Sequence, residues 1–460
     1  MPLSREALTD LAHDHCAADL LTDDACARMI GWTLEEASAF FESGGDSVPD
    51  RAKPMPIPPP IKRHHDRMLL CLHSSAGSGE IMRSQMASLT GVIESFDLAF
   101  LEGMLEMDPA VQPEARMLRQ FFPGAPNRSY LQLVEVDEAS GEERPVLLAT
   151  NALAAGGGNA LSTGGAMERT GVHKEYRGLE AALQQLAACI ASASARGERY
   201  DGVLAFSQGG NLLTIMLGLL EAAEAAASAE ESHASALAAG PEKAAAKAAA
   251  RAAAEVAARR SRLLRPPFCA LFCAIEFGYV TQLRSSQALA ARCLSALDAG
   301  IAQACHPDWN IGAASQDVRA LSASLFAAPL SKVKAIAVVG VADPAVEACR
   351  QLATEVFAAG TCTLLEHQQG HKMPSAQEKS VCVRISNFCR VGLADEIIAG
   401  CSAFYRHRRL GWLAVKVTKV DYQGVADGGA TYCVTAPELD GEVETVRERL
   451  ALAKPEADGE

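Results

Sequence analysis

The stretch YDGVLAFSQGGNLLTIMLGLL, from Tyr200 to Leu220, constrains the fold of this chain more than any other. A short aliphatic segment typical of a buried strand meets an apolar helical pattern, and only Ser207 separates the two. So sharp a turn leaves room only for small side chains two positions either side of its centre, and these are Ala205 and Gly209. The pattern predicts a strand-turn-helix elbow that exposes the Ser207 hydroxyl above the sheet. A plain helix cap is the alternative, since Ser is a favoured N-cap residue.

Five other apolar segments have the length and composition of buried strands. They are MLLCL, DLAFL, CALFCAIEF, VKAIAVVG and TCTLLEH. Helical patterns lie between several of them, and such alternation favours a mostly parallel sheet with helices on both faces. We therefore expect an α/β-hydrolase fold, preceded by a small helical segment and followed by a β-barrel.

Composition shifts divide the chain into four parts. Residues 1–47 are helical in pattern and resemble a ubiquitin-associated bundle, and the Pro-rich residues 48–65 predict an extended linker. The α/β-hydrolase domain is expected over 66–395, with a Gly-rich insertion near 154–171 and an Ala-rich helical insertion near 222–260.

The C-terminal part, residues 404–452, consists of short strand patterns broken by Gly and Asp turns. It resembles an SH3-like or Tudor-like module, which implies a protein partner. Its aromatic residues Trp412, Tyr422 and Tyr432 are either a binding surface or the core of the module, and the core is favoured because aromatic side chains are largely buried.

A nucleophilic Ser207 needs a general base and an acid that orients it, in the chain order Ser, acid, His. Asp343 directly follows the strand VKAIAVVG, and His371 follows TCTLLEH in the loop QQGHKMP. Strand ends at the carboxyl edge are where open α/β sheets place their sites. We therefore predict a Ser207, Asp343 and His371 triad, with Asp308 as the alternative acid.

An oxyanion hole is the remaining requirement of acyl transfer. One expected donor is the backbone N–H of Gln208, and the other is the backbone N–H of Ser75 in the loop HSSAGSG, with the amide of Ser75 rather than its hydroxyl as the donor. His73 is expected to brace this loop by hydrogen bonds instead of acting as a second base.

Five segments together resemble the FSH-type family of serine hydrolases, α/β-hydrolases that include the ovarian-cancer-associated hydrolase and fungal esterases and thioesterases. They are LCLHSSAGS, YRGLEAAL, LAFSQGG, VVGVADPAV and EHQQGHKMP, and the resemblance spans about residues 66 to 392. It implies the same triad of Ser207, Asp343 and His371. The chain departs from the family at Ser74 and Ala205, where the family usually has Gly.

Composition narrows the classes of partner and cofactor. A net charge of −14 argues against nucleic acid. The 14 Cys are scattered in apolar contexts typical of reduced, buried thiols, and Cys269 and Cys273 lack a second pair of ligands at zinc spacing, so neither a metal nor another cofactor is expected. No signal peptide or membrane span is recognised, which favours the cytoplasm, with the nucleus as a further location.

These observations predict a serine hydrolase that cleaves small-molecule esters or thioesters through an acyl-enzyme. An interaction protein built on a weak or inactive hydrolase core is the alternative from another class. A relative of the acyl-protein thioesterases is the alternative within the enzymes, because FSQGG also fits that family's pattern.

Overall fold

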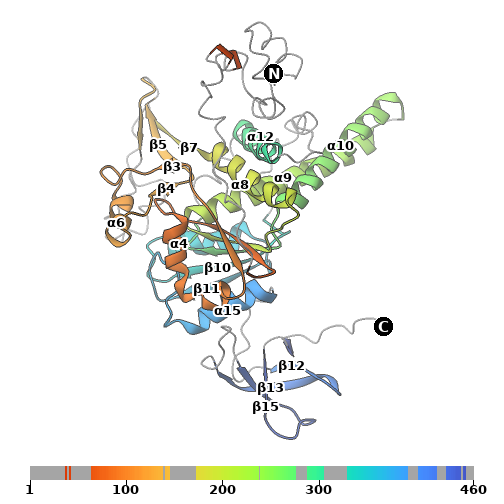
Figure 1. The fold of residues 1–460 in the computed structure, drawn as a ribbon. Coiled ribbons are helices and arrows are strands. Elements are labelled where there is room, and N and C mark those ends of the chain that lie inside the picture. The colour runs from red at the N-terminus through yellow and green to blue at the C-terminus, as the bar shows by residue number, and fades with distance from the viewer. Residues whose placement is uncertain are drawn as a thin grey trace.

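The computed structural model describes the greater part of the chain (Figure 1). Four residues of the N-terminal segment are described, and all are helical. The predicted Gly-rich insertion, the linker up to residue 63, Asp308 and Tyr422 lie outside the described residues. The described ranges are 37–38, 41–42, 64–137, 140–145, 172–237, 239–275, 287–304, 329–391, 402–421, 431–446 and 449–451.

A six-stranded sheet, parallel throughout, forms the centre of the fold in the order β11-β10-β9-β8-β1-β2. Its strands are β1 (Met68–Leu72), β2 (Asp97–Leu101), β8 (Gly202–Phe206), β9 (Phe268–Phe272), β10 (Lys334–Gly340) and β11 (Cys362–His367). All six correspond to the strands predicted from apolar runs. The order of strands changes direction between β2 and β8, so the carboxyl ends of β1 and β8 lie at the switch point where such sheets commonly bind ligands.

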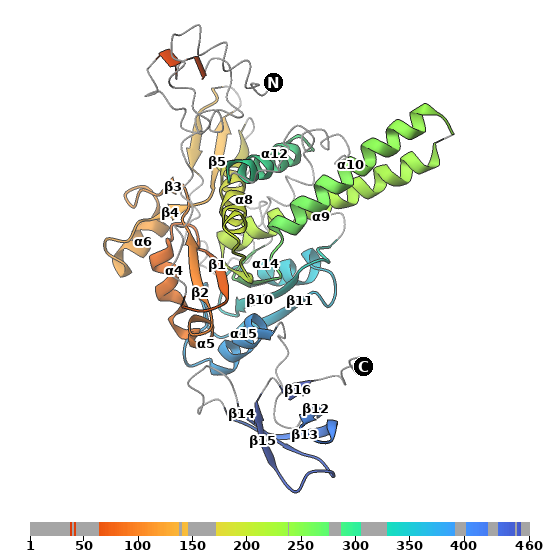
Figure 2. The same ribbon diagram turned by 45° about the vertical axis from the view of Figure 1, so that its right-hand side comes forward.

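Helices cover both faces of this sheet, which confirms the predicted layers (Figures 1 and 2). One face packs against α4 (Gly79–Gln85), η3 (Met86–Ser88), α5 (Thr90–Ile93) and α15 (Lys379–Val391), and the other against α8 (Leu179–Ala195), α9 (Gln208–Ala236) and α12 (Gln287–Gln303). The short α14 (Val346–Gln351) and η5 (Leu352–Val356) lie between β10 and β11. Along β1, Leu70 and Leu72 enter one core while Leu69 and Cys71 enter the other, as the alternation of a strand requires.

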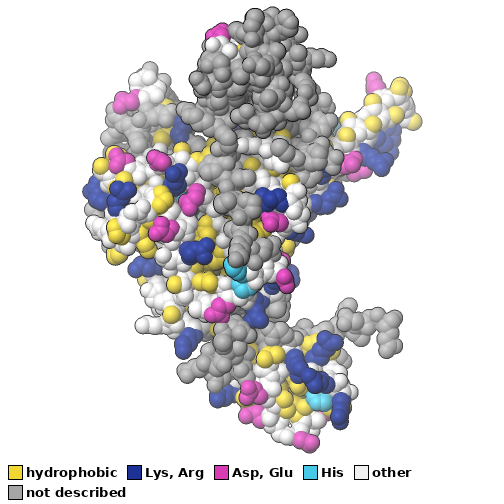
Figure 3. All heavy atoms as spheres, in the orientation of Figure 1, with side chains coloured by type: hydrophobic (Ala, Val, Ile, Leu, Met, Phe, Trp, Pro, Cys, Tyr) yellow, Lys and Arg dark blue, Asp and Glu magenta, His cyan; other side chains and the backbone are white. Residues whose placement is uncertain are grey.

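The Ala-rich region forms the second half of α9 and the helix α10 (Pro241–Leu264), which pair as a hairpin that projects from the core (Figures 1 and 2). The base of this hairpin belongs to the main core, where Ala223, Ala227 and Ala257 are buried. Its outer part is solvated, and Figure 3 shows Lys and Arg side chains along one side of it. The insertion therefore has a buried root as well as a projecting arm.

Within the described ranges, α9 is long and apolar enough to cross a membrane by length and composition, which the sequence pattern had not indicated. However, 72% of its apolar window is buried inside the protein. We interpret α9 as the central core helix, whose first turn carries the elbow.

Five short antiparallel strands and one helix, which the sequence did not predict, connect β2 to α8 in the described part of the chain. They are β3 (Leu105–Glu106), α6 (Pro113–Phe121), β4 (Arg128–Ser129), β5 (Gln132–Asp137), β6 (Glu143–Pro145) and β7 (Val172–Arg177). β3 pairs with β4, and the other three strands form a sheet in the order β6-β5-β7. The segment between β4 and β5 passes beside the elbow.

The C-terminal part is a small antiparallel β module with the strand order β15-β14-β13-β12-β16. Its strands are β12 (Ser402–His407), β13 (Gly411–Asp421), β14 (Thr431–Thr435), β15 (Val443–Val446) and β16 (Leu450–Ala451). Tyr432 is fully buried in the core of this module, together with Val417 and Val434, whereas Trp412 is half-buried.

Candidate active site

Ser207 lies at the junction between β8 and α9 with φ 51° and ψ −115°. A positive φ is uncommon for a residue with a side chain, and such strain gathers at functional sites. The described part of the chain has two other non-glycine residues of this kind, Ala76 after β1 and Cys273 after β9. Because β1, β8 and β9 are neighbours in the sheet, the three strained residues follow the carboxyl ends of adjacent strands.

The elbow has the close packing that its small residues suggested. A Cβ atom on Gly209 would lie 2.6 Å from the Leu72 carbonyl oxygen and 2.8 Å from that of His73, so the start of α9 touches the end of β1 directly. The Gly209 N–H donates to the His73 carbonyl at 3.2 Å. Ala205 is fully buried within β8.

Three side chains form a hydrogen-bonded line at this edge of the sheet. Nδ1 of His371 lies 2.7 Å from Oδ2 of Asp343, and Nε2 of His371 lies 2.9 Å from Oγ of Ser207. An Nδ1–H that donates to the carboxylate leaves Nε2 to accept the Ser207 proton. The Asp343 side chain is 1% exposed, whereas that of His371 is 39% exposed, so the carboxylate is shielded and the imidazole faces solvent.

The electrostatics of Asp343 favour its ionised form. Burial alone would raise the pKa of this carboxyl, but the hydrogen bond and charge of His371 and the N–H of Ala345 outweigh it and hold the pKa below its usual value. Oδ1 accepts the Ala345 N–H at 2.9 Å. A fixed, charged carboxylate is what orients an imidazole.

The loops that carry Asp343 and His371 are packed on each other. A Cβ on Gly340 would lie 2.2 Å from the carbonyl oxygens of both Gln369 and Gly370, so only glycine allows the histidine loop to lie on the end of β10. The Ala342 N–H also donates to the Gln369 carbonyl at 3.2 Å. The distance between acid and base is thereby set by backbone contacts.

The two expected oxyanion donors belong to the elbow and to the loop that follows β1. Gln208 is the first residue of α9, and Ser75 lies in a turn closed by the Gly77 N–H and the Ser74 carbonyl at 3.1 Å. Among the described residues, neither the Ser75 nor the Gln208 N–H donates a hydrogen bond. Their N–H groups thus take no part in the backbone hydrogen bonds that close the neighbouring turn.

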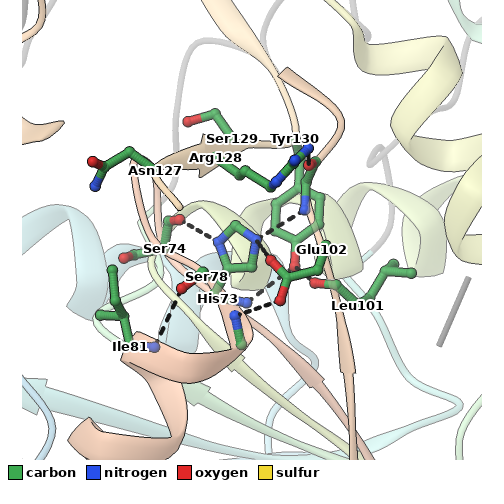
Figure 4. A network of polar contacts seen from close by, with 12 residues as sticks. His73, Ser74, Ser78, Ile81, Leu101, Glu102, Asn127, Arg128, Ser129 and Tyr130 are labelled. Carbon is green, nitrogen blue, oxygen red and sulfur yellow. Dashed lines mark hydrogen bonds and ion pairs between the residues drawn. The ribbon is translucent and has the colours of Figure 1, made fainter. Parts of the chain in front are cut away.

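His73 lies in the interior beneath this turn (Figure 4). Its Nδ1 donates to the Ser74 carbonyl at 2.7 Å, its Nε2 accepts the Gly103 N–H at 2.9 Å, and its ring stacks on Tyr130 with centroids 4.6 Å apart. Burial lowers the pKa of His73 to about 4, which keeps the ring neutral. These contacts suit a brace of the loop.

Cys273, which the sequence offered only as a rejected zinc ligand, is a neighbour of the site. Burial and the nearby Asp343 charge raise the pKa of its thiol to about 12, and its Sγ donates to the Lys372 carbonyl at 3.5 Å. It reaches this place because β9 and β10 are paired, with Phe272 opposite Val338. Only this pairing between distant segments could have revealed the contact, since the apolar run CALFCAI indicates no more than a buried thiol.

Among the residues that the structure describes, one group offers ligand atoms close enough for a metal. Atoms of Cys273, Asp343 and His371 lie within 4.8 Å of one another. However, Nδ1 of His371 is already bonded to Asp343, and the thiol is protonated and buried. The donor set therefore fits a hydrogen-bonded triad with an adjacent thiol better than a metal centre.

A family model for serine hydrolases, described as "Serine hydrolase (FSH1)", matches residues 63–382. The chain belongs to this family. No curated protein and no solved structure matches the chain. The matched segment of this FSH1-family hydrolase contains Ser207, Asp343 and His371, whereas the C-terminal module lies beyond it. Membership supports a hydrolase with a small-molecule substrate, built on a mostly parallel sheet.

Proposed function

We propose that this protein cleaves carboxylic esters or thioesters through an acyl-enzyme on Ser207. The observation that carries the proposal is the line of hydrogen bonds from Ser207 through His371 to Asp343, at 2.9 Å and 2.7 Å. Such a line serves nucleophilic catalysis, because a hydroxyl is a weak nucleophile until a base removes its proton.

The proposed reaction has two halves. Oγ of Ser207 attacks the acyl carbonyl while Nε2 of His371 takes the hydroxyl proton, and the resulting oxyanion accepts hydrogen bonds from the Ser75 and Gln208 amides. The tetrahedral intermediate collapses, the bond to the alcohol or thiol breaks, and His371 returns the proton to that leaving group. Water then attacks the acyl-enzyme with His371 as base, which releases the acid and restores Ser207. Asp343 stays ionised and stabilises the imidazolium in both halves.

Turnover of a p-nitrophenyl acyl ester and of an acyl thioester tests this function. We expect hydrolysis of at least one of them by the wild-type protein and loss of turnover in Ser207→Ala. A wild-type protein that cleaves neither class, over short and long acyl chains, would favour the alternative of an interaction protein on an inactive core.

We also propose that the C-terminal module is SH3-like and binds a protein partner. Four strands follow one another as a meander and the short β16 returns to pair with β12, an order that supports a partly closed barrel. Binding of a partner by residues 402–451 would be measured by pull-down with and without this module. Equal capture by the shortened protein would contradict the proposal.

A further inference from the structure

The segment from Asn127 to Leu131 contacts both halves of the candidate oxyanion hole. It includes β4 and precedes β5, so it belongs to neither the central sheet nor the triad loops. Ser129, Tyr130 and Leu131 are at most 1% exposed. Buried backbone groups need hydrogen-bond partners. For Asn127, Arg128 and Ser129 these come largely from β3, Met107 and Gly77, whereas for Tyr130 and Leu131 the elbow supplies them.

On the elbow side, the carboxamide of Gln208 forms hydrogen bonds with the backbone of Tyr130 and Leu131, as a neighbouring strand would. Its Oε1 accepts the N–H of Tyr130 at 2.8 Å and that of Leu131 at 3.4 Å, and its Nε2 donates to the Leu131 carbonyl at 2.9 Å. The residue whose backbone N–H would bind the oxyanion thus binds this segment with its side chain.

On the other side, Ser129 holds the turn that contains Ser75. Its Oγ accepts the Ala76 N–H at 3.0 Å and lies 3.0 Å from Oγ of Ser75. Either of these two hydroxyls can donate to the other, and Ser129 is fully buried whereas Ser75 is partly exposed. Asn127 adds a bond from Nδ2 to the Ala76 carbonyl at 2.9 Å.

Tyr130 holds the start of the same loop through its hydroxyl (Figure 4). Its hydroxyl accepts the His73 N–H at 3.1 Å and donates to the Leu101 carbonyl at 2.7 Å. The peptide units on both sides of Ser75 are therefore bonded, directly or through His73, to residues 127–131.

We propose that residues 127–131 and the Gln208 carboxamide form one positioning unit, which fixes the distance between the Ser75 and Gln208 amides. The inference rests on the proposed function and names how its oxyanion hole is held. Gln208 would then act as a donor through its backbone and as a positioning residue through its side chain, and Ser129 as a positioning residue only. Donors must sit within a few tenths of an ångström of the oxyanion to be effective, so loss of this unit lowers transition-state binding.

The test compares wild type with Gln208→Met, Ser129→Ala and the double variant. Turnover of an activated ester gives kcat and KM, and the inhibition constant of an acyl trifluoromethyl ketone reports binding of a tetrahedral adduct. We expect Gln208→Met to lower kcat about 10- to 100-fold with KM within about threefold, because one effective donor is worth up to about 10³. The inhibition constant of the ketone should rise by the same factor as kcat falls. Ser129→Ala should lower kcat and raise this inhibition constant by about 3- to 10-fold.

If both residues act through one unit, their effects are not additive. The kcat of the double variant should therefore be no more than about twofold below that of Gln208→Met alone. Gln184→Met on α8, whose carboxamide makes one long bond of 3.4 Å to Gln303, is the matched control and should behave as wild type. Thermal unfolding of each variant shows which proteins are folded at the assay temperature.

Folded Gln208→Met and Ser129→Ala proteins with wild-type kcat and ketone affinity would overturn the positioning unit while leaving the proposed hydrolase intact, and so would fully additive losses. If Gln208→Met does not fold, Ser129→Ala alone decides in the same way. A wild-type protein without Ser207-dependent turnover would instead refute the proposed function and this inference with it.

Discussion

Replacement of Gly209 by Ala tests the elbow most severely, because the space for the added methyl is already occupied. The new Cβ would lie 2.6 Å from the Leu72 carbonyl oxygen, 2.7 Å from the Leu72 Cβ and 2.8 Å from the His73 carbonyl oxygen. An ordinary contact begins near 3.4 Å, so the start of α9 must move by about 0.8 Å from the end of β1. None of these atoms can rotate away.

Two effects on stability oppose each other. Ala is favoured over Gly within a helix by about 1 kcal/mol, whereas overpacking of a buried contact costs about 1 to 3 kcal/mol. We therefore expect a net loss of up to about 2 kcal/mol, which leaves the protein folded at 25 °C. Activity should suffer more, because the shift moves the Gln208 amide and the Ser207 hydroxyl together, and a displacement of about 1 Å costs on the order of 100-fold in rate.

The assay is steady-state ester turnover beside thermal unfolding, with Gly240→Ala as the matched control. A Cβ on Gly240, between α9 and α10, would meet nothing within 4 Å, so this variant should keep wild-type turnover. Wild-type kcat in a folded Gly209→Ala protein would refute the argument that the contact between α9 and β1 sets the geometry of the site.

Three further predictions concern the acid, the buried histidine and the hairpin. Asp343→Asn should lower kcat by about 10⁴-fold because the imidazole loses its orienting acceptor. Asp308→Asn should change kcat less than about tenfold. The opposite ranking of the two variants in ester turnover would reassign the acid. Folding lowers the pKa of His73 from an ordinary 6.5 to about 4, so the folded state resists protonation of this ring. The neutral ring therefore contributes its full stability above pH 6.5. The free energy of unfolding should decrease by about 3 kcal/mol as the pH falls to 4. Urea unfolding at pH 7 and pH 4.5 should show this loss in wild type and not in His73→Gln, and an equal pH dependence in both would be evidence against it. Replacing residues 230–253 of the hairpin by a short linker should leave turnover within about threefold, since the buried root at Ala223, Ala227 and Ala257 remains; a loss of 100-fold in a folded protein would show that the arm shapes the site.

The sequence was sufficient for the central sheet because most of its strands are continuous apolar runs, as strands buried on both faces must be, and the edge strand β11 still carries an apolar centre. It also selected Ser207, Asp343 and His371, three residues that lie within hydrogen-bonding distance in the structure. Their common feature is local: each lies within four residues of the end of a strand, and the carboxyl ends of parallel strands share one edge.

The contacts around this line could not be predicted in the same way. Ser129 and Tyr130 lie in the run APNRSYLQ, which has neither strand nor helix periodicity, and their importance arises from hydrogen bonds to Gln208 and Ser75 far along the chain. Cys273 depends likewise on the pairing of β9 with β10. The Ala-rich pattern indicated a helix, but small side chains do not show which alanines are buried, so the root of the hairpin was not foreseen.

Labelling with a fluorophosphonate probe tests the central claim most directly, because it requires an activated serine and no knowledge of the substrate. Wild-type protein treated with the probe is digested, and the modified peptide is identified by mass spectrometry, beside Ser207→Ala and His371→Ala. We predict a single adduct on Ser207 in the wild type, none in Ser207→Ala, and labelling slowed by at least about 100-fold in His371→Ala. An adduct that persists in Ser207→Ala, or a folded wild-type protein that takes up no probe, would contradict the account.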